Sequence, residues 1–196
     1  MQDKQTSTYW SLMKGAALEG ELKGEMLEEL PIGEKMKWKD WAVKYPNTKV
    51  LSVNSRQDAR AGYERYFNDS EGFRGLKAKD DRLETKAPVF AFHYNGTPQA
   101  IAYSKIQNGV SIELDPGKHL FLYRDAKDEL FRSTTALVSK QGFERVEDVW
   151  KELESGVVFD VQTRTFENQE LESMNGFDTF WYNWSLNNPD TKLLMP

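Results

Sequence analysis

The residue types best suited to catalysis are scarce in this chain. It has two histidines, His93 and His119, and no cysteine. Without thiols it can form no disulfide and hold no cysteine-ligated zinc or iron–sulfur cluster. His119 lies between Asp115 and Asp125 in the sequence. A pair of His119 with either carboxylate is therefore one candidate for hydrolysis or metal-assisted chemistry.

Spacing argues against a dedicated catalytic motif. The chain lacks the His-Glu-x-x-His spacing of a zinc site and the Gly-x-Ser-x-Gly of a nucleophile elbow, and its glycines do not fit a phosphate loop. No metal and no cofactor are expected. Among 31 acidic residues a carboxylate pair is easy to find by chance. We interpret Asp3 and Asp160 as turn residues that accept hydrogen bonds from nearby backbone N–H groups.

A second candidate site lies in the polar, irregular stretch of residues 54–87. Guanidinium groups and aromatic rings together suit a small anionic or sugar-like ligand. The residues that supply them are Arg60, Tyr63, Arg65, Tyr66 and Arg74. The alternative is a loop that covers a sheet edge and is anchored by its rings.

Charge and hydropathy exclude two classes of partner. The net charge is −5, and basic residues are interspersed with acidic ones, so we expect no nucleic-acid binding. No apolar run approaches ~18 residues, so we expect no membrane span. The first residues lack the apolar core of a secretory signal. We expect a soluble protein, cytoplasmic as written and exported if an N-terminal leader is missing from this sequence.

Most of the chain has strand character. From residue 88 apolar residues alternate, and Asn95-Gly96 is a strong hairpin marker. Residues 88–159 should therefore be β-rich, with a short helical turn expected around Val149, Trp150 and Leu153. Trp38 and Trp41 lie on one face of a short helix that Pro46 ends.

Two blocks of the sequence occur twice. Asp3-x-Gln-Thr-x-Thr-Tyr matches Asp160-x-Gln-Thr-x-Thr-Phe, and Trp38-x-x-Trp with Pro-x-Thr-Lys matches Trp181-x-x-Trp with the same ending. Such matched spacing predicts one structural unit used about one and a half times. The first copy lacks the β-rich front half, which would leave an open sheet edge.

These patterns predict a β-rich α+β fold of mostly antiparallel sheets with short aromatic helices. We divide the chain into residues 1–53 (second half of the first copy), 54–87 (connecting segment) and 88–196 (second copy), within one compact domain. A homo-oligomer that completes the half copy is one expected assembly.

The chain resembles the C-terminal portion of the family called domain of unknown function 3179. The pieces that carry the resemblance are Asp3 to Trp10, Gly15 to Pro31, Trp38-x-x-Trp41 to Ser52, Asp81-Arg82-Leu83, Lys86 to Val89, Asn95 to Tyr103 and Thr179 to Leu194. The family has no established activity to carry over. Its members often contain an upstream Cys-Pro-x-Cys-like motif, which implies redox chemistry, and this sequence has no cysteine.

Three functions therefore stay open. The favoured one is a non-enzymatic binding or interaction module of an uncharacterised prokaryotic family. The alternatives are a hydrolase or metal-assisted enzyme that uses His119 with a nearby carboxylate, and the remnant of a redox protein whose cysteine motif is absent here.

Overall fold

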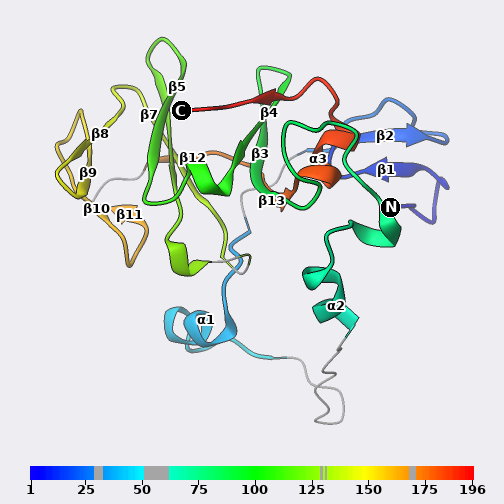
Figure 1. Ribbon diagram of the computed structural model, residues 1–196, viewed down its shortest axis with the longest axis horizontal. Coiled ribbons are helices and arrows are strands. Elements are labelled where there is room, and N and C mark those ends of the chain that lie inside the picture. The colour runs from blue at the N-terminus through cyan, green and yellow to red at the C-terminus, as the bar shows by residue number, and fades with distance from the viewer. Residues whose placement is uncertain (29–32, 51–61, 129, 131, 168–170) are drawn as a thin grey trace.

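A computed structural model describes residues 1–28, 33–50, 62–128, 130, 132–167 and 171–196. Two four-stranded sheets form its centre (Figure 1). The β3–β4 sheet contains β13 (Phe177–Phe180), β3 (Pro88–Tyr94), β4 (Thr97–Ala102) and β14 (Lys192–Leu193), in that order. The β6–β7 sheet contains β12 (Glu172–Ser173), β7 (Thr135–Ser139), β6 (Lys118–Tyr123) and β5 (Val110–Asp115). All their pairings are antiparallel except that of β14 with β4.

Smaller elements flank this pair of sheets. Three hairpins are formed by β1 (Tyr9–Ser11) with β2 (Ala16–Glu19), β8 (Phe143–Val146) with β9 (Val149–Glu152), and β10 (Phe159–Asp160) with β11 (Thr165–Phe166). The helices are α1 (Trp38–Lys44), α2 (Gly62–Asn68) and α3 (Trp181–Asn187), with 3-10 turns η1 (Phe73–Gly75), η2 (Tyr103–Lys105) and η3 (Ala126–Asp128). The β-rich α+β prediction is confirmed.

Alternation along the strands explains the layers. Phe90 and Phe92 of β3 face the β6–β7 sheet, where they meet Leu120 and Leu122 in one apolar cluster. The alternate residue Ala91 faces the other way and packs under the tryptophans of α3. On the outer face of the β6–β7 sheet, five buried rings form a third cluster with the β8–β9 and β10–β11 hairpins: Phe121, Tyr123, Phe143, Phe159 and Phe166.

Two local predictions need correction. Val149–Glu152 forms strand β9 and not a helical turn, because the neighbouring segment Phe143–Val146 pairs with it along its whole length. A short apolar run is compatible with the period of a helix and with that of a strand, and here pairing with the neighbouring segment makes it a strand. Within the stretch expected to be irregular, residues Gly62–Asn68 form helix α2.

The two Asp-led blocks adopt matching turns. Asp3 Oδ1 accepts bonds from the backbone N–H groups two and three residues on, at 3.0 and 2.8 Å. Asp160 Oδ1 does the same at 2.6 and 3.2 Å. Ser7 and Arg164, at equivalent positions, both have positive φ (56° and 64°). The bonds from the Thr6 backbone and hydroxyl and from the Trp10 indole lower the pKa of Asp3. The interpretation of both aspartates as turn residues is confirmed.

The two tryptophan helices match in local geometry and differ in burial. Each is preceded by an extended residue, and each ends with a cap N–H bonded to the carbonyl of its second tryptophan, Trp41 or Trp184. Trp181 and Trp184 are fully buried, whereas α1 buries no residue and Trp38 is 56% exposed. The repeated Trp-x-x-Trp pattern would lead one to expect that both helices bury their tryptophans against a sheet. This is correct for α3 and wrong for α1. The description as one and a half copies, and the domain boundaries drawn from it, stay predictions.

This contrast gives a matched test of stability. Trp181→Ala should lower the free energy of unfolding by about 3–5 kcal/mol, because it opens a cavity in the cluster around α3. Trp38→Ala, at the equivalent helix position, should change it by less than about 1 kcal/mol, since that side chain is mostly in solvent. Urea denaturation followed by circular dichroism measures both. Equal losses in the two variants would contradict the burial described for α1.

Candidate ligand-binding cavity

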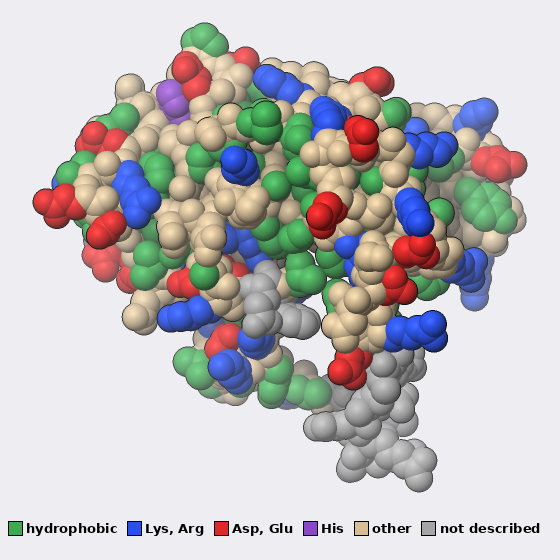
Figure 2. All heavy atoms as spheres, viewed as in Figure 1, with side chains coloured by type: hydrophobic (Ala, Val, Ile, Leu, Met, Phe, Trp, Pro, Cys, Tyr) green, Lys and Arg blue, Asp and Glu red, His purple; other side chains and the backbone are tan. Residues whose placement is uncertain are grey.

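A cavity of about 340 Å³ lies where α2 and the segment before α1 approach β13 and α3. Five aromatic side chains form much of its wall: Tyr66, Phe67, Tyr103, Phe180 and Tyr182. Leu130 and the polar residues Lys35, Asp178, Thr179 and Asn183 complete the lining. Figure 1 shows α1 and α2 projecting from the same side of the sheets, and the space-filling view is hollowed between them (Figure 2). An apolar wall with a few polar groups is typical of small-molecule sites.

Helix α2 is held in place through one tyrosine and one lysine. The Tyr66 hydroxyl lies 2.9 Å from the Tyr182 hydroxyl, and the Tyr66 ring meets Phe180 edge to face with centroids 6.0 Å apart. Lys86 Nζ donates to the backbone carbonyls of Tyr66 and Asp69 at the end of the helix, where a cation is favourable. Burial, together with the bond to Tyr182, raises the pKa of Tyr66. The Tyr66 phenol therefore stays protonated near neutral pH.

Asp178 anchors a polar network beside this cavity. Its Oδ1 accepts bonds from the Tyr103 hydroxyl at 2.6 Å and from Arg124 Nη1 at 3.3 Å. The Thr134 hydroxyl bonds to the same oxygen, and the Thr134 N–H donates to Oδ2 at 2.8 Å. The guanidinium of Arg124 lies 3.7 Å from the centre of the Tyr103 ring and is almost fully buried. We call these four residues the Asp178 clamp.

The clamp keeps Tyr103 neutral. Burial raises the pKa of Tyr103, and the negative charge of Asp178 raises it further. The phenol is then a fixed hydrogen-bond donor and not a proton shuttle near neutral pH. A second cavity of about 280 Å³ shares Tyr103 and Leu130 with the first. Arg124 and Asp125 line it, together with Ser104 and Gln107.

Of the predicted ligand residues that the structure describes, only Tyr66 lines either cavity. Tyr63 is 63% exposed, and Arg65 is exposed on the same helix. Arg74 is exposed and lies against the Phe73 ring, 5.2 Å from its centre. Arg60 falls outside the described residues. The structure therefore gathers rings at this site, whereas Arg65 and Arg74 do not join them.

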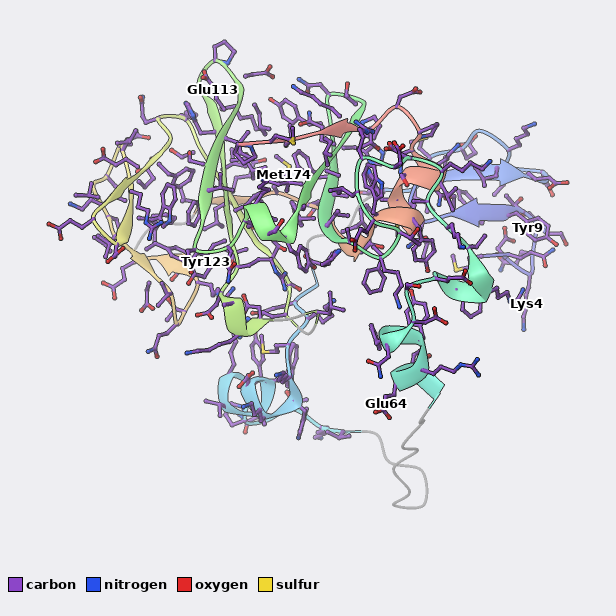
Figure 3. The ribbon with its side chains drawn as sticks, in the orientation of Figure 1. Lys4, Tyr9, Glu64, Glu113, Tyr123 and Met174 are labelled. Carbon is purple, nitrogen blue, oxygen red and sulfur yellow. The ribbon has the colours of Figure 1, made fainter. Side chains whose placement is uncertain are left out.

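The structure separates His119 from both of its proposed carboxylate partners. His119 lies opposite Glu113 and Ser139 in the β6–β7 sheet, whereas Asp115 lies opposite Lys118. Neighbouring residues of a strand point to opposite faces, so His119 and Asp115 do not share a face. Asp115 instead accepts the Tyr94 hydroxyl at 2.6 Å. Asp125 follows Tyr123 at the end of β6, and Figure 3 labels Tyr123 at that end of the β5–β6 pair and Glu113, the β5 residue opposite His119, at the other.

Sequence reasoning missed Tyr103, Asp178, Phe180 and Tyr182. The last three lie in or beside the second tryptophan block, whose repeated spacing points to structure and names no ligand residue. Within the described part of the chain, no three His, Asp or Glu side chains converge closely enough to hold a metal ion. None of the described helices combines the length and apolar character needed to cross a membrane.

Comparison with known proteins returns one match. The model of a family described as "Protein of unknown function (DUF3179)" matches residues 1–191. No curated protein and no solved structure matches the chain.

The clamp makes a graded prediction of stability. Asp178→Ala removes the carboxylate that faces the buried Arg124 charge, which typically costs about 3–5 kcal/mol. Tyr103→Phe removes only one bond to that carboxylate, so we expect about 1.5–3 kcal/mol. Tyr63→Phe, which alters an exposed phenol, should be neutral within about 0.5 kcal/mol. Guanidinium denaturation ranks the three variants, and a Tyr103→Phe loss as small as that of Tyr63→Phe would contradict the clamp.

Proposed function

We propose that this chain, which belongs to the DUF3179 family of proteins of unknown function, is a binding module whose aromatic cavity holds a small, neutral, sugar-like ligand. The observation that carries the proposal is the wall of five rings beside the Asp178 clamp. The C–H face of a sugar ring packs against aromatic faces, whose negative quadrupole attracts it. Its hydroxyls can bond to the few polar groups at the edge.

The polar groups favour a neutral ligand over an anion. Among the described residues that line the aromatic cavity, Lys35 is the one cation and Asp178 the one carboxylate, so the lining has no excess of positive charge. The Asn183 amide donates to the Thr179 hydroxyl at 3.0 Å, which orients two further polar groups on one wall. Fixed hydroxyl and amide dipoles of this kind recognise hydroxyl groups without requiring a net charge on the ligand.

The test is a set of sugars and a matched pair of variants. Saturation-transfer NMR with glucose, galactose, mannose and N-acetylglucosamine should give transfer to at least one sugar. Phe67→Ala, which removes a half-exposed wall residue, should lower the affinity for that sugar roughly three- to tenfold, because the contact with the ring is lost. Tyr63→Ala, on the outer side of the same helix, should leave affinity unchanged.

Two outcomes would count against the sugar proposal. One is the absence of transfer to every sugar tested with the folded wild-type protein. The other is equal affinity in Phe67→Ala and wild type, since the ligand would then bind elsewhere. Circular dichroism of each variant establishes that α2 and the sheets are retained before affinities are compared.

The exposed face of α1 favours a second role, self-association. Trp38 is 56% exposed and Tyr45 41% on the face that also carries Trp41, and hydrophobic side chains are visible on this projecting part of the surface (Figure 2). The equivalent helix α3 is covered by a sheet, so a helix of this type is stable when its rings are buried. A second copy of the chain brings the same face, and a twofold axis would place each face against its equal.

Sedimentation velocity tests this second role. The wild-type protein should form dimers whose fraction rises with concentration. Trp38→Glu should shift the protein toward monomer, because it places a charge in the contact. Val161→Glu, which introduces the same charge at an exposed valine between β10 and β11, should not. A wild-type protein that stays monomeric at every concentration would refute self-association and leave the sugar proposal untouched.

A further inference from the structure

A separate cavity of about 270 Å³ lies beside the β10–β11 hairpin, and its lining differs from that of the aromatic cavity. Three cations line it, Lys44, Arg132 and Arg164, against one carboxylate among the described lining residues, Glu34. Hydroxyl groups supply most of the remaining polar surface: Ser133, Thr134, Thr135, Thr163, Thr165 and Ser173. Cations and hydroxyls together form a set of hydrogen-bond donors.

Arg164 is held in an unusual position. Its backbone φ of 64° lies in the left-handed region, which is sparsely populated by residues with a side chain. Its guanidinium is 11% exposed, and Nη2 donates to Asp128 at 2.6 Å. Asp128 is itself fixed by accepting the Asp125 backbone N–H at 2.6 Å. One end of the fork is therefore committed to a buried carboxylate.

The other end of the same guanidinium is unsatisfied. Arg164 Nη1 is buried and has no hydrogen-bond partner among the residues that the structure describes. Buried polar groups are nearly always paired, and a buried donor without a partner points to a water or an ion that completes it. Arg164 lines this cavity, so a small shift of its side chain that uncovers Nη1 would let a ligand with acceptor oxygens supply the missing bond.

The surrounding charges favour an anion over a neutral acceptor. Glu34 lies 2.6 Å from Lys44 and 3.8 Å from Arg132, so its charge is already offset. A neighbouring cavity of about 200 Å³ also contains Arg132 and adds Lys37, Lys39 and Lys127 against Asp40 and Asp128. This concentration of cations stands out in a chain of net charge −5, and it would draw anions toward the cavity.

We propose that the cavity beside the β10–β11 hairpin binds a tetrahedral oxyanion of the phosphate type, held by Arg164 and Arg132 and by hydroxyls at its rim. The planar guanidinium of Arg132 matches the spacing of two oxygens on such an anion, Arg164 adds the single donor Nη1, and these charge-assisted bonds are the strong ones. The site is independent of the proposed sugar cavity, because the two sets of lining residues do not overlap.

Inorganic phosphate is the probe. Titration at constant ionic strength, with chloride as the balancing ion, should raise the Tm of the full chain with the logarithm of one plus the ratio of the phosphate concentration to its Kd. Arg132→Gln should weaken the apparent affinity for phosphate about tenfold, the loss expected for one charge-assisted pair. Arg164→Lys keeps a cation near Asp128 but lacks the second guanidinium nitrogen that would reach the anion. It should lower the affinity for phosphate to a similar extent. Phosphorus-31 line broadening measures the same affinities without heating.

Arg145→Gln is the matched control. Arg145 is an exposed arginine of β8 that pairs with Asp148 at 3.2 Å and lines neither cation-rich cavity. This variant should respond to phosphate as the wild type does. Phosphate also stabilises proteins generally by exclusion from their surface, and that effect would appear equally in all variants. An equal rise in Tm in wild type and Arg132→Gln, or no rise in wild type, would overturn the proposal.

Discussion

The Asp178 clamp is the interaction that ties the two central sheets together at one end. Asp178 belongs to β13 and Tyr103 directly follows β4, so both lie on the side of the β3–β4 sheet. Arg124 follows β6 and Thr134 precedes β7, on the side of the β6–β7 sheet. The apolar cluster between the sheets is non-directional and would tolerate sliding. The clamp adds directional, charge-assisted bonds that set their relative position, and Tyr103 lines both the aromatic cavity and its neighbour.

The duplicated blocks separate what local sequence determines from what packing determines. Both Asp-led turns and both tryptophan helices have matching backbone geometry, although their surroundings differ. Capping and turn chemistry act within a few residues, so they do not need a tertiary partner. Burial of the rings, in contrast, needs a tertiary partner. The tryptophans of α3 pack against Val89, Ala91 and Ala100, whereas α1 has no buried residue. The same sequence pattern thus produces a core helix in one place and an exposed one in the other.

The same distinction explains how much could be predicted from the sequence. The hairpin at Asn95-Gly96 and the alternation of β3 follow from local rules, and both are observed. Helix α2 was not predicted because its stability comes from distant partners, Tyr182 and Lys86, more than from an apolar period. The cavity gathers residues from five separate segments, and only Tyr66 carried a recognisable pattern. His119 and Asp115 are close in sequence, yet strand alternation places them on opposite faces.

The bonding of Asp178 also limits the chemistry open to the aromatic cavity. An ionised carboxylate has about four acceptor positions, and the clamp supplies donors to both oxygens from Tyr103, Arg124 and Thr134. To take a proton from a ligand, Asp178 would first have to give up one of these bonds, and Tyr103, whose raised pKa keeps its phenol protonated near neutral pH, has no free base to offer. The clamp is therefore suited to holding the cavity in shape. In the proposed sugar site, contact with the ligand then falls to the rings of Tyr66, Phe67 and Phe180.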